Sequence, residues 1–416
     1  MSQMRDLPRL LYVGDVPVES SYHGSALLYR LLQDYPSDKL LVVEAETYLS
    51  LPARRLPEVP YRTLPVAAKR LRNTRFSRLA GSWLTVTPSI SAMRLRRVSE
   101  EFGPEAVLTV AHGYSWLVAA RIAEAAELPL HLIVHDHWPE TTSVWPWLKG
   151  MQDRQFGEVY RQAASRLCVS PFMEEDYRRR YGVEGQVLYP SRAKDCPLFD
   201  QAPATYIKDT GPLIGAYAGN IFHAGYARLI LTLAESLDRR GGRLLLFGPH
   251  SREQLTAWGL NRPNVLAQGL VASEDLVSRL RDEADFVFVP MAFDSDGSQH
   301  NMRISFPSKL TDYTATGLPL LICGPDYCSA VRWAQRYGGL AEVVTTPIAD
   351  GIDAAVQRLE QRQYRERLGQ ASMQIGNDLF SHRAAADILY SVIMAGGSGV
   401  PSHGAASKEC GAASAE

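Results

Sequence analysis

The chain has 416 residues, of which 46% are hydrophobic and 21% are charged, and its formal net charge is −1. This length suffices for two ordinary domains, and the composition is that of a soluble globular protein rather than a disordered or fibrous one. A near-neutral chain has no overall attraction to nucleic acid or to anionic membranes.

Targeting and metal-binding signals are weak. No apolar run reaches the roughly 18 residues of a transmembrane helix, and residues 1–10 lack the layout of a signal peptide. The five cysteines are scattered and odd in number, which favours a reducing cytoplasm. Cys323 and Cys328 have no second Cys or His pair nearby, so a metal site there is not favoured. We expect a cytoplasmic protein, with peripheral association to the inner face of the cell membrane left open.

The first 45 residues have the order strand, loop, helix, strand. Apolar segments 9–13 and 40–43 predict buried strands, and residues 26–32 have a helical pattern. The intervening polar loop contains His23 and Gly24. This order opens a doubly wound α/β domain, in which ligands bind beyond the carboxyl ends of the strands.

Residues 51–97 are strongly basic and contain a single acid, Glu58. Aromatic and aliphatic residues such as Phe76 and Trp83 are interleaved among the arginines. A basic amphipathic segment of this kind can lie on an anionic bilayer. It can also be a solvated helical face or a site for a phosphorylated ligand. Nucleic acid is not expected, because no recognised binding module accompanies the charge. The basic residues are Arg54, Arg55, Arg62, Lys69, Arg70, Arg72, Arg75, Arg78, Arg94, Arg96 and Arg97.

Two further predicted strands end in histidine-bearing loops. Strand 106–110 leads to His112, and strand 130–134 leads to His135 and Asp136. The carboxyl ends of parallel strands meet at one sheet edge, so several such residues together indicate a site. A linker is expected over 191–211.

A second α/β cycle begins at 212–218. Its first loop contains Gly219, Asn220 and His223, and its second strand, 243–247, is followed by Gly248. Asp294 and Asp296 resemble an acid pair for metal, but a polar loop is the favoured interpretation. Further strands are expected at 265–266, 285–289, 320–323 and 341–344, with helices at 273–283, 329–337, 350–375 and 380–394.

The stretch 305–321 is the strongest candidate for a ligand site. Pro307 and Ser308 form a turn that can cap a short helix carrying Lys309, Asp312 and Tyr313. A break at Gly317 and Pro319 precedes the apolar strand 320–323. A helix N-terminus with a lysine beside the end of a buried strand suits a phosphate or pyrophosphate.

Five motifs of the second half resemble those of a known protein family. They are Gly219-Asn220, Gly248-Pro249, Gln268-Gly269, the run 284–290 and the run 306–319. Together they resemble GT-B glycosyltransferases, best the family 4-like group of retaining enzymes, over residues 9–395. The resemblance implies two Rossmann-like domains facing a cleft: an acceptor-side domain, 1–200, and a nucleotide-sugar-binding domain, 201–380. A helix over 381–395 is expected to close back on the first domain, before a disordered tail, 396–416.

The resemblance also implies the chemistry. The protein is expected to move a sugar from a nucleoside-diphosphate sugar to a glycan or lipid-linked acceptor, with retention and without metal or cofactor. The expected pathway is cell-surface polysaccharide or glycoconjugate biosynthesis. Lys309 corresponds to the lysine that faces the donor phosphates, Asp312 to an acid at the ribose, and His112 to a histidine that approaches the donor sugar. The other expected donor residues are Gly24, Gly219, Asn220, His223, Gly248, Arg303, Ser308 and Tyr313, and the acceptor-side residues are His23, His135 and Asp136.

The chain departs from the family pattern at two places. The family has two acids eight positions apart; Asp312 matches the second, but Ile304 stands at the first. Loop 219–225 has no Lys or Arg, so Arg303 and Lys309 are the expected substitutes. Two alternatives therefore stay open: a non-catalytic nucleotide-sugar-binding or scaffold subunit, and a nucleotide-sugar epimerase.

Overall fold

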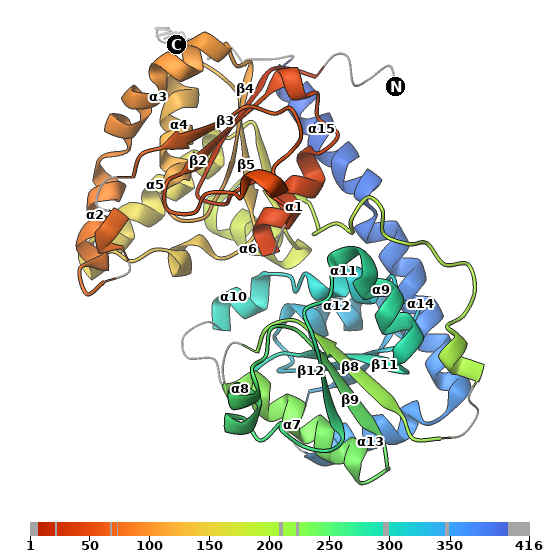
Figure 1. The fold of residues 1–416 in the computed structure, drawn as a ribbon. Helices are drawn as coiled ribbons and strands as arrows, with labels where there is room; N and C mark the ends of the chain where they lie inside the picture. The colour runs from red at the N-terminus through yellow and green to blue at the C-terminus, as the bar shows by residue number, and fades with distance from the viewer. Residues whose placement is uncertain are drawn as a thin grey trace, which may run out of the picture.

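The computed structural model describes residues 7–20, 23–66, 69–72, 74–207, 211–221, 224–293, 299–345 and 349–397. Two parallel sheets, each flanked by helices on both faces, form two stacked α/β domains (Figure 1). Within these ranges, no helix combines the length and apolarity needed to cross a bilayer.

The N-terminal sheet has the order β3-β2-β1-β4-β5-β6-β7. Its central strands are buried along their whole length, which explains their unbroken apolar sequences. The strands are β1 (Leu10–Gly14), β2 (Leu40–Ala45), β3 (Tyr61–Leu64), β4 (Ala106–Val110), β5 (Leu130–Val134), β6 (Ser165–Cys168) and β7 (Gln186–Val187). The helices are α1 (His23–Leu32), α2 (Ser77–Val86), α3 (Pro88–Phe102), α4 (Ser115–Ala125), α5 (Lys149–Gln162) and α6 (Pro171–Tyr181), with short 3-10 turns η2 (Ser37–Lys39), η3 (Pro52–Arg54), η4 (Lys69–Leu71), η5 (Trp138–Thr141) and η6 (Pro146–Leu148).

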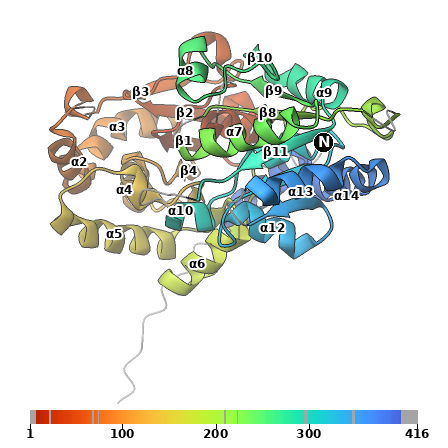
Figure 2. The same cartoon turned by 90° about the horizontal axis from the view of Figure 1, so that it is seen from below.

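The C-terminal sheet has the order β10-β9-β8-β11-β12-β13. Helices α7 and α13 lie side by side on one of its faces (Figure 2), where Ser236 and Arg240 bind Asp353. The strands are β8 (Ile214–Ala218), β9 (Arg243–Phe247), β10 (Val265–Gly269), β11 (Phe286–Pro290), β12 (Leu320–Cys323) and β13 (Ala341–Val344). The other elements are η7 (Ala204–Ile207), α7 (Ala224–Asp238), α8 (Arg252–Ala257), α9 (Ser273–Glu283), α10 (Gln299–Ile304), α11 (Lys309–Tyr313), α12 (Ser329–Tyr337), α13 (Ala349–Leu359) and α14 (Arg362–Phe380).

The last helix, α15 (His382–Gly397), crosses back to the N-terminal domain. Leu389 and Ile393 are fully buried in the same apolar cluster as Leu28 of α1. Tyr390 Oη donates a 3.0 Å hydrogen bond to the carbonyl oxygen of Leu31. The expected closing helix is therefore confirmed, and Figure 1 shows it running beside the first domain.

Two parts of the predicted secondary structure were wrong. The basic stretch is not one amphipathic segment: it contains the edge strand β3, η4, α2 and α3. The helical pattern expected over 350–375 ends at Leu359 and restarts at Arg362, which gives two helices, α13 and α14. Residues 398–416 of the expected tail lie outside the described residues.

Candidate active site

A cleft of about 520 Å³ lies between the two domains. The N-terminal side lines it with α1, with Pro190 and with Ser191, the first residue of the linker. The C-terminal domain lines it with α11 and with the loops after β8 and β9. The structure thus brings together these predicted donor-side and catalytic residues: Gly219, Asn220, Gly248, Ser308, Lys309, Asp312 and Tyr313.

Lys309 is held over the end of β8. Its Nζ donates a 2.6 Å hydrogen bond to Tyr217 Oη and lies 4.0 Å from the centroid of that ring. The Tyr217 hydroxyl donates in turn to the carbonyl oxygen of Asn220 at 2.7 Å. Burial lowers the pKa of Lys309 to about 7, and no carboxylate of the described residues forms an ion pair with it. An anion in the cleft would supply the missing charge partner and raise that pKa again.

Gly219 makes room for this lysine. Its φ is +130°, and a Cβ placed there would lie 2.8 Å from both Cε and Nζ of Lys309. Any other residue at this position would be strained and would push the ammonium away from Tyr217. The glycine after β8 is therefore explained by the close approach of Lys309.

His250 lies next to the cleft-lining Gly248, and it was not predicted as a site residue. A Cβ on Gly248 would lie 2.7 Å from His250 Nε2 and 2.8 Å from the carbonyl oxygen of Gly219. Burial lowers the pKa of His250, and the positive charge of Lys309 lowers it further. The signal was present, because His250 follows β9 at the same sheet edge as Gly219.

Asp312 lies near two arginines. Burial raises the pKa of Asp312, and the charges of Arg30 and Arg192 oppose that rise. Arg30 reaches the cleft from α1 and donates a 2.6 Å hydrogen bond to the carbonyl oxygen of Ser191. Arg192 is buried in the linker, where its Nε donates to the carbonyl oxygen of Thr311 at 3.0 Å. Neither arginine was predicted, because both come to Asp312 only through the packing of the two domains.

Ser308 and Tyr313 occupy the cleft wall in different ways. Ser308 has helical φ and ψ and makes no side-chain capping bond, so the expected cap is wrong. Its hydroxyl group is exposed at the cleft. The buried Tyr313 hydroxyl accepts a 2.7 Å hydrogen bond from Ala218 N and donates to Ala218 O at 3.2 Å. Tyr313 thus fixes α11 against the end of β8.

The predicted residues of the N-terminal domain gather at its own sheet edge. A Cβ on Gly24 would lie 3.5 Å from His135 Nδ1, so the two residues are in contact. His112 is close enough for its charge to affect His135. Burial lowers the pKa of His135 to about 4, so its imidazole is neutral at pH 7. His23 is the first residue of α1, at the same edge.

Asp136 bridges the two domains. Its Oδ1 accepts 3.4 Å hydrogen bonds from Asn301 Nδ2 and Ser305 Oγ of the C-terminal domain. The next residue, His137, donates its backbone N–H to Asn301 Oδ1 at 2.8 Å. The loop after β5 is therefore tied to α10, only a few residues before Lys309.

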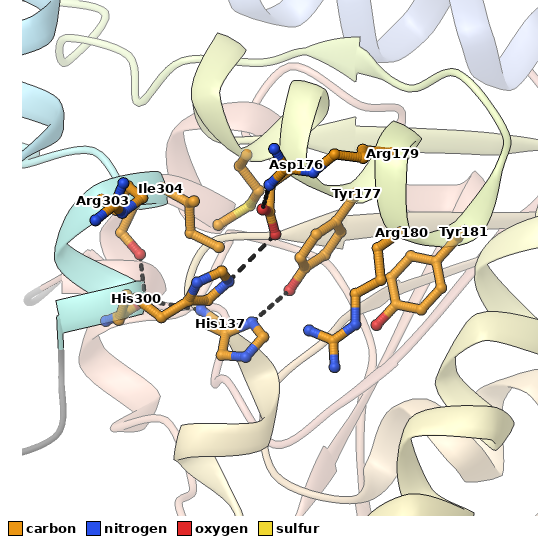
Figure 3. A network of polar contacts seen from close by, with 12 residues as sticks. His137, Asp176, Tyr177, Arg179, Arg180, Tyr181, His300, Arg303 and Ile304 are labelled. Atoms are coloured by element: carbon orange, nitrogen blue, oxygen red, sulfur yellow. Dashed lines mark hydrogen bonds and ion pairs between the residues drawn. The ribbon is translucent and has the colours of Figure 1, made fainter. Parts of the chain in front are cut away.

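A polar cluster extends this contact (Figure 3). The rings of His137 and His300 are 4.4 Å apart, and His137 Nδ1 lies 3.2 Å from Tyr177 Oη. His300 Nε2 lies 3.2 Å from Asp176 Oδ2. Burial and the charge of His300 lower the pKa of His137 to about 4. The cluster joins α6 to α10 through neutral and charged hydrogen-bonding groups.

Two positions before α11 differ from the predicted roles. Arg303 is exposed, its guanidinium lies 5.2 Å from the centroid of the Tyr327 ring, and it is not among the residues that line the cleft. Of the two expected basic substitutes, only Lys309 lines the cleft. Ile304 is buried, and its carbonyl oxygen accepts a hydrogen bond from Ser170 Oγ. This apolar environment explains why an acid does not fit there.

Some predicted residues lie outside the described part of the chain. These are His223 and the polar loop 294–298, which includes Asp294 and Asp296.

Comparison with known proteins agrees with this geometry. Residues 31–189 match the family model described as a glycosyl transferase 4-like domain. No curated protein sequence matches the chain significantly.

The similar solved structures extend over both domains. HepE of Anabaena, solved with UDP and glucose, has a TM-score of 0.62 and 13% identity, over 93% of this chain and 100% of that one. Sucrose-phosphate synthase of Thermosynechococcus elongatus has a TM-score of 0.64 and 16% identity, over 93% and 99%. The lipopolysaccharide outer core galactosyltransferase WaaB has a TM-score of 0.58 and 14% identity, over 92% and 99%. The chain has the GT-B fold, as the sequence resemblance predicted.

Proposed function

We propose that this GT-B protein is a glycosyltransferase that moves a sugar from a nucleoside-diphosphate sugar to a hydroxyl group of a glycan or lipid-linked acceptor. The observation that carries the proposal is Lys309, which lies against Gly219 in the interdomain cleft and has no carboxylate partner among the described residues. The presence of UDP and glucose in the HepE structure supports a uridine diphosphate sugar as the donor.

The cleft offers a separate environment for each part of such a donor. The diphosphate would lie beside Lys309 and the loop at Gly219 and Asn220, where charge and backbone groups are available. The apolar wall formed by Leu270 and Val271 suits a nucleobase. Asp312 is the proposed acceptor of hydrogen bonds from the ribose, as in the family that the sequence resembles.

The reaction breaks the bond between the anomeric carbon and the β-phosphate oxygen. The acceptor oxygen forms the new bond on the same face of the sugar, which gives retention, and the acceptor proton passes to the leaving phosphate. Lys309 stabilises the negative charge that develops on the diphosphate. His112 approaches the donor sugar, and the neutral His135 can exchange hydrogen bonds with a hydroxyl group. In this scheme the protein needs no cofactor and no metal, and a chelator should leave turnover unchanged.

The acceptor is proposed to bind the N-terminal domain, at the edge that carries His23, His135 and Asp136. The name of the similar WaaB supports a role in cell-surface polysaccharide or glycoconjugate biosynthesis. The scattered cysteines support a cytoplasmic location.

A thermal-shift screen of nucleotide sugars tests the donor, because a ligand that binds only the folded state raises the melting temperature. The stabilising donor is then incubated with and without a pool of acceptor glycans and lipid-linked sugars. Release of UDP only when acceptor is present supports the proposal, and NMR of the product shows whether the anomeric configuration is retained. Interconversion of the donor without acceptor would indicate an epimerase instead.

A non-catalytic nucleotide-sugar-binding subunit is the second candidate. Ile304 favours it, because an isoleucine buried in the core stands where the family has an acid. Donor binding by calorimetry without turnover against any acceptor pool would support this candidate over the enzyme.

A further inference from the structure

Helix α2 turns an apolar stripe toward solvent. Leu79, Trp83 and Val86 follow one another at helical spacing and are 53%, 51% and 54% exposed. The small residues Ala80 and Gly81 take the buried side of the helix instead. Both views place α2 at the outer edge of the N-terminal domain (Figure 1, Figure 2). The apolar face of this helix therefore has no partner within the described chain.

Two tryptophans of another segment extend this stripe. Trp147 is 75% exposed and Trp145 is 41% exposed, next to η6. Their segment packs on α2, since Trp145 N donates to Ser82 Oγ at 3.2 Å and a Cβ on Gly81 would collide with Ser143 O. We call the exposed apolar residues of these two segments the tryptophan patch: Leu79, Trp83, Val86, Trp145 and Trp147.

The sequence around α2 contains several arginines and no acidic residue. No Asp or Glu occurs between Glu58 and Glu100. The structure divides the basic residues of this stretch into two groups. Arg72 is paired with Asp15, and Lys69, Arg96 and Arg97 are paired with glutamates. Among the described residues, the exposed Arg75, Arg78 and Arg94 form no ion pair.

We infer that the tryptophan patch docks this protein on the surface of an anionic lipid bilayer. Tryptophan side chains favour the interface between headgroups and acyl chains, and aliphatic residues beside them insert at the same depth. Unpaired arginines close to such residues add attraction to anionic headgroups. Tryptophan and arginine are also enriched at protein interfaces, so the vesicle experiment below includes outcomes that separate a protein partner from a bilayer.

The segment that carries Trp145 and Trp147 is hydrogen-bonded to the segment after β4. Tyr114 Oη donates to Ser143 O at 3.1 Å and accepts from Ser143 N at 2.9 Å. Tyr114 closely follows His112, and Ser143 closely precedes Trp145. Docking would therefore place the loop after β4, which carries His112, near the bilayer surface. The inference does not depend on the proposed activity, because lipid binding is measured without turnover.

Co-sedimentation with vesicles tests this inference on the full chain. The wild type is expected to bind vesicles of equimolar phosphatidylcholine and phosphatidylglycerol at low salt, and to bind pure phosphatidylcholine much less. The double variant Trp83→Ser/Trp147→Ser should bind at least about tenfold more weakly, because two large apolar side chains no longer insert. The matched control is Leu198→Ser, which removes an 80% exposed leucine from the linker and should change nothing. Unchanged melting temperatures establish that the variants are folded.

Neutral substitutions test the electrostatic part. Each of Arg75→Gln, Arg78→Gln and Arg94→Gln should weaken binding by about fivefold at low salt, while Arg252→Gln on the other domain should not. Equal binding to neutral and anionic vesicles, or full binding by the double tryptophan variant, overturns the inference. The inference is also overturned if the wild type does not bind vesicles but self-associates, and the double tryptophan variant abolishes that self-association. Binding only to vesicles that contain a polyprenyl phosphate would assign the patch to a lipid-linked acceptor and overturn the bilayer assignment.

Discussion

Replacing Lys309 with Met keeps the volume of the side chain and removes its charge. A charge-assisted hydrogen bond to a phosphate contributes about 1.5–3 kcal/mol, so UDP should bind about 10- to 150-fold more weakly. Isothermal titration calorimetry with UDP at pH 7 measures the loss. Lys149→Met, which changes an exposed lysine of α5, is the matched control and should keep wild-type affinity.

The same variant tests the titration of Lys309. Its pKa is about 7 in the free protein, and a bound diphosphate raises it, so the wild type should lose affinity as the pH rises from 7 to 9. The loss is at most about 50-fold if the bound lysine stays charged at pH 9. Lys309→Met should show no such dependence, because His250 is already neutral above pH 7 and burial keeps Tyr217 protonated.

Folding stability gives an independent check of that pKa. The pKa of Lys309 falls from 10.5 in the unfolded chain to about 7, so the folded protein binds fewer protons between these values. Wild-type stability should therefore rise across this pH window relative to Lys309→Met. Equal UDP affinities and equal pH dependence for the two proteins would refute the assignment of the phosphate site to Lys309.

Three further substitutions test other parts of the site. Gly219→Ala should weaken UDP binding at least about tenfold while the protein stays folded, because the new Cβ displaces Lys309; calorimetry and a thermal melt measure both. Arg192→Met should lower the free energy of unfolding by about 3 kcal/mol or more, because it removes a buried guanidinium that binds the backbone and side chains of the C-terminal domain. Chemical denaturation measures this change, and a value below about 1 kcal/mol would contradict the structure. Asn301→Ala removes the contacts of α10 with Asp136 and should open the cleft, seen as a larger radius of gyration in solution scattering, whereas an unchanged radius would show that this contact does not hold the domains together.

The central strands were predictable because burial on both faces leaves a continuous apolar sequence. Strand β12 and helix α9 were predicted with their observed bounds. The edge strand β3 was missed, since only Leu64 of its four residues is buried and the segment carries no apolar run. An exposed edge strand of this kind has no apolar pattern from which its position can be predicted.

The candidate site was partly predictable for a related reason. Gly219 and Lys309 could be predicted as site residues from local sequence patterns, because these patterns show where loops leave the parallel strands. Arg30 and Arg192 reach Asp312 through domain packing, which no local pattern records. The direction of Arg303 was likewise set by its stacking on Tyr327.

Helix α15 has a consequence for how the protein is made. The N-terminal domain leaves the ribosome first, yet its core is completed by Leu389 and Ile393, which are among the last described residues to be synthesised. Until then, α1 and its neighbours expose the apolar surface that α15 covers. The first domain therefore matures last, and a chain that stops after α14 would leave that surface open to proteolysis and aggregation.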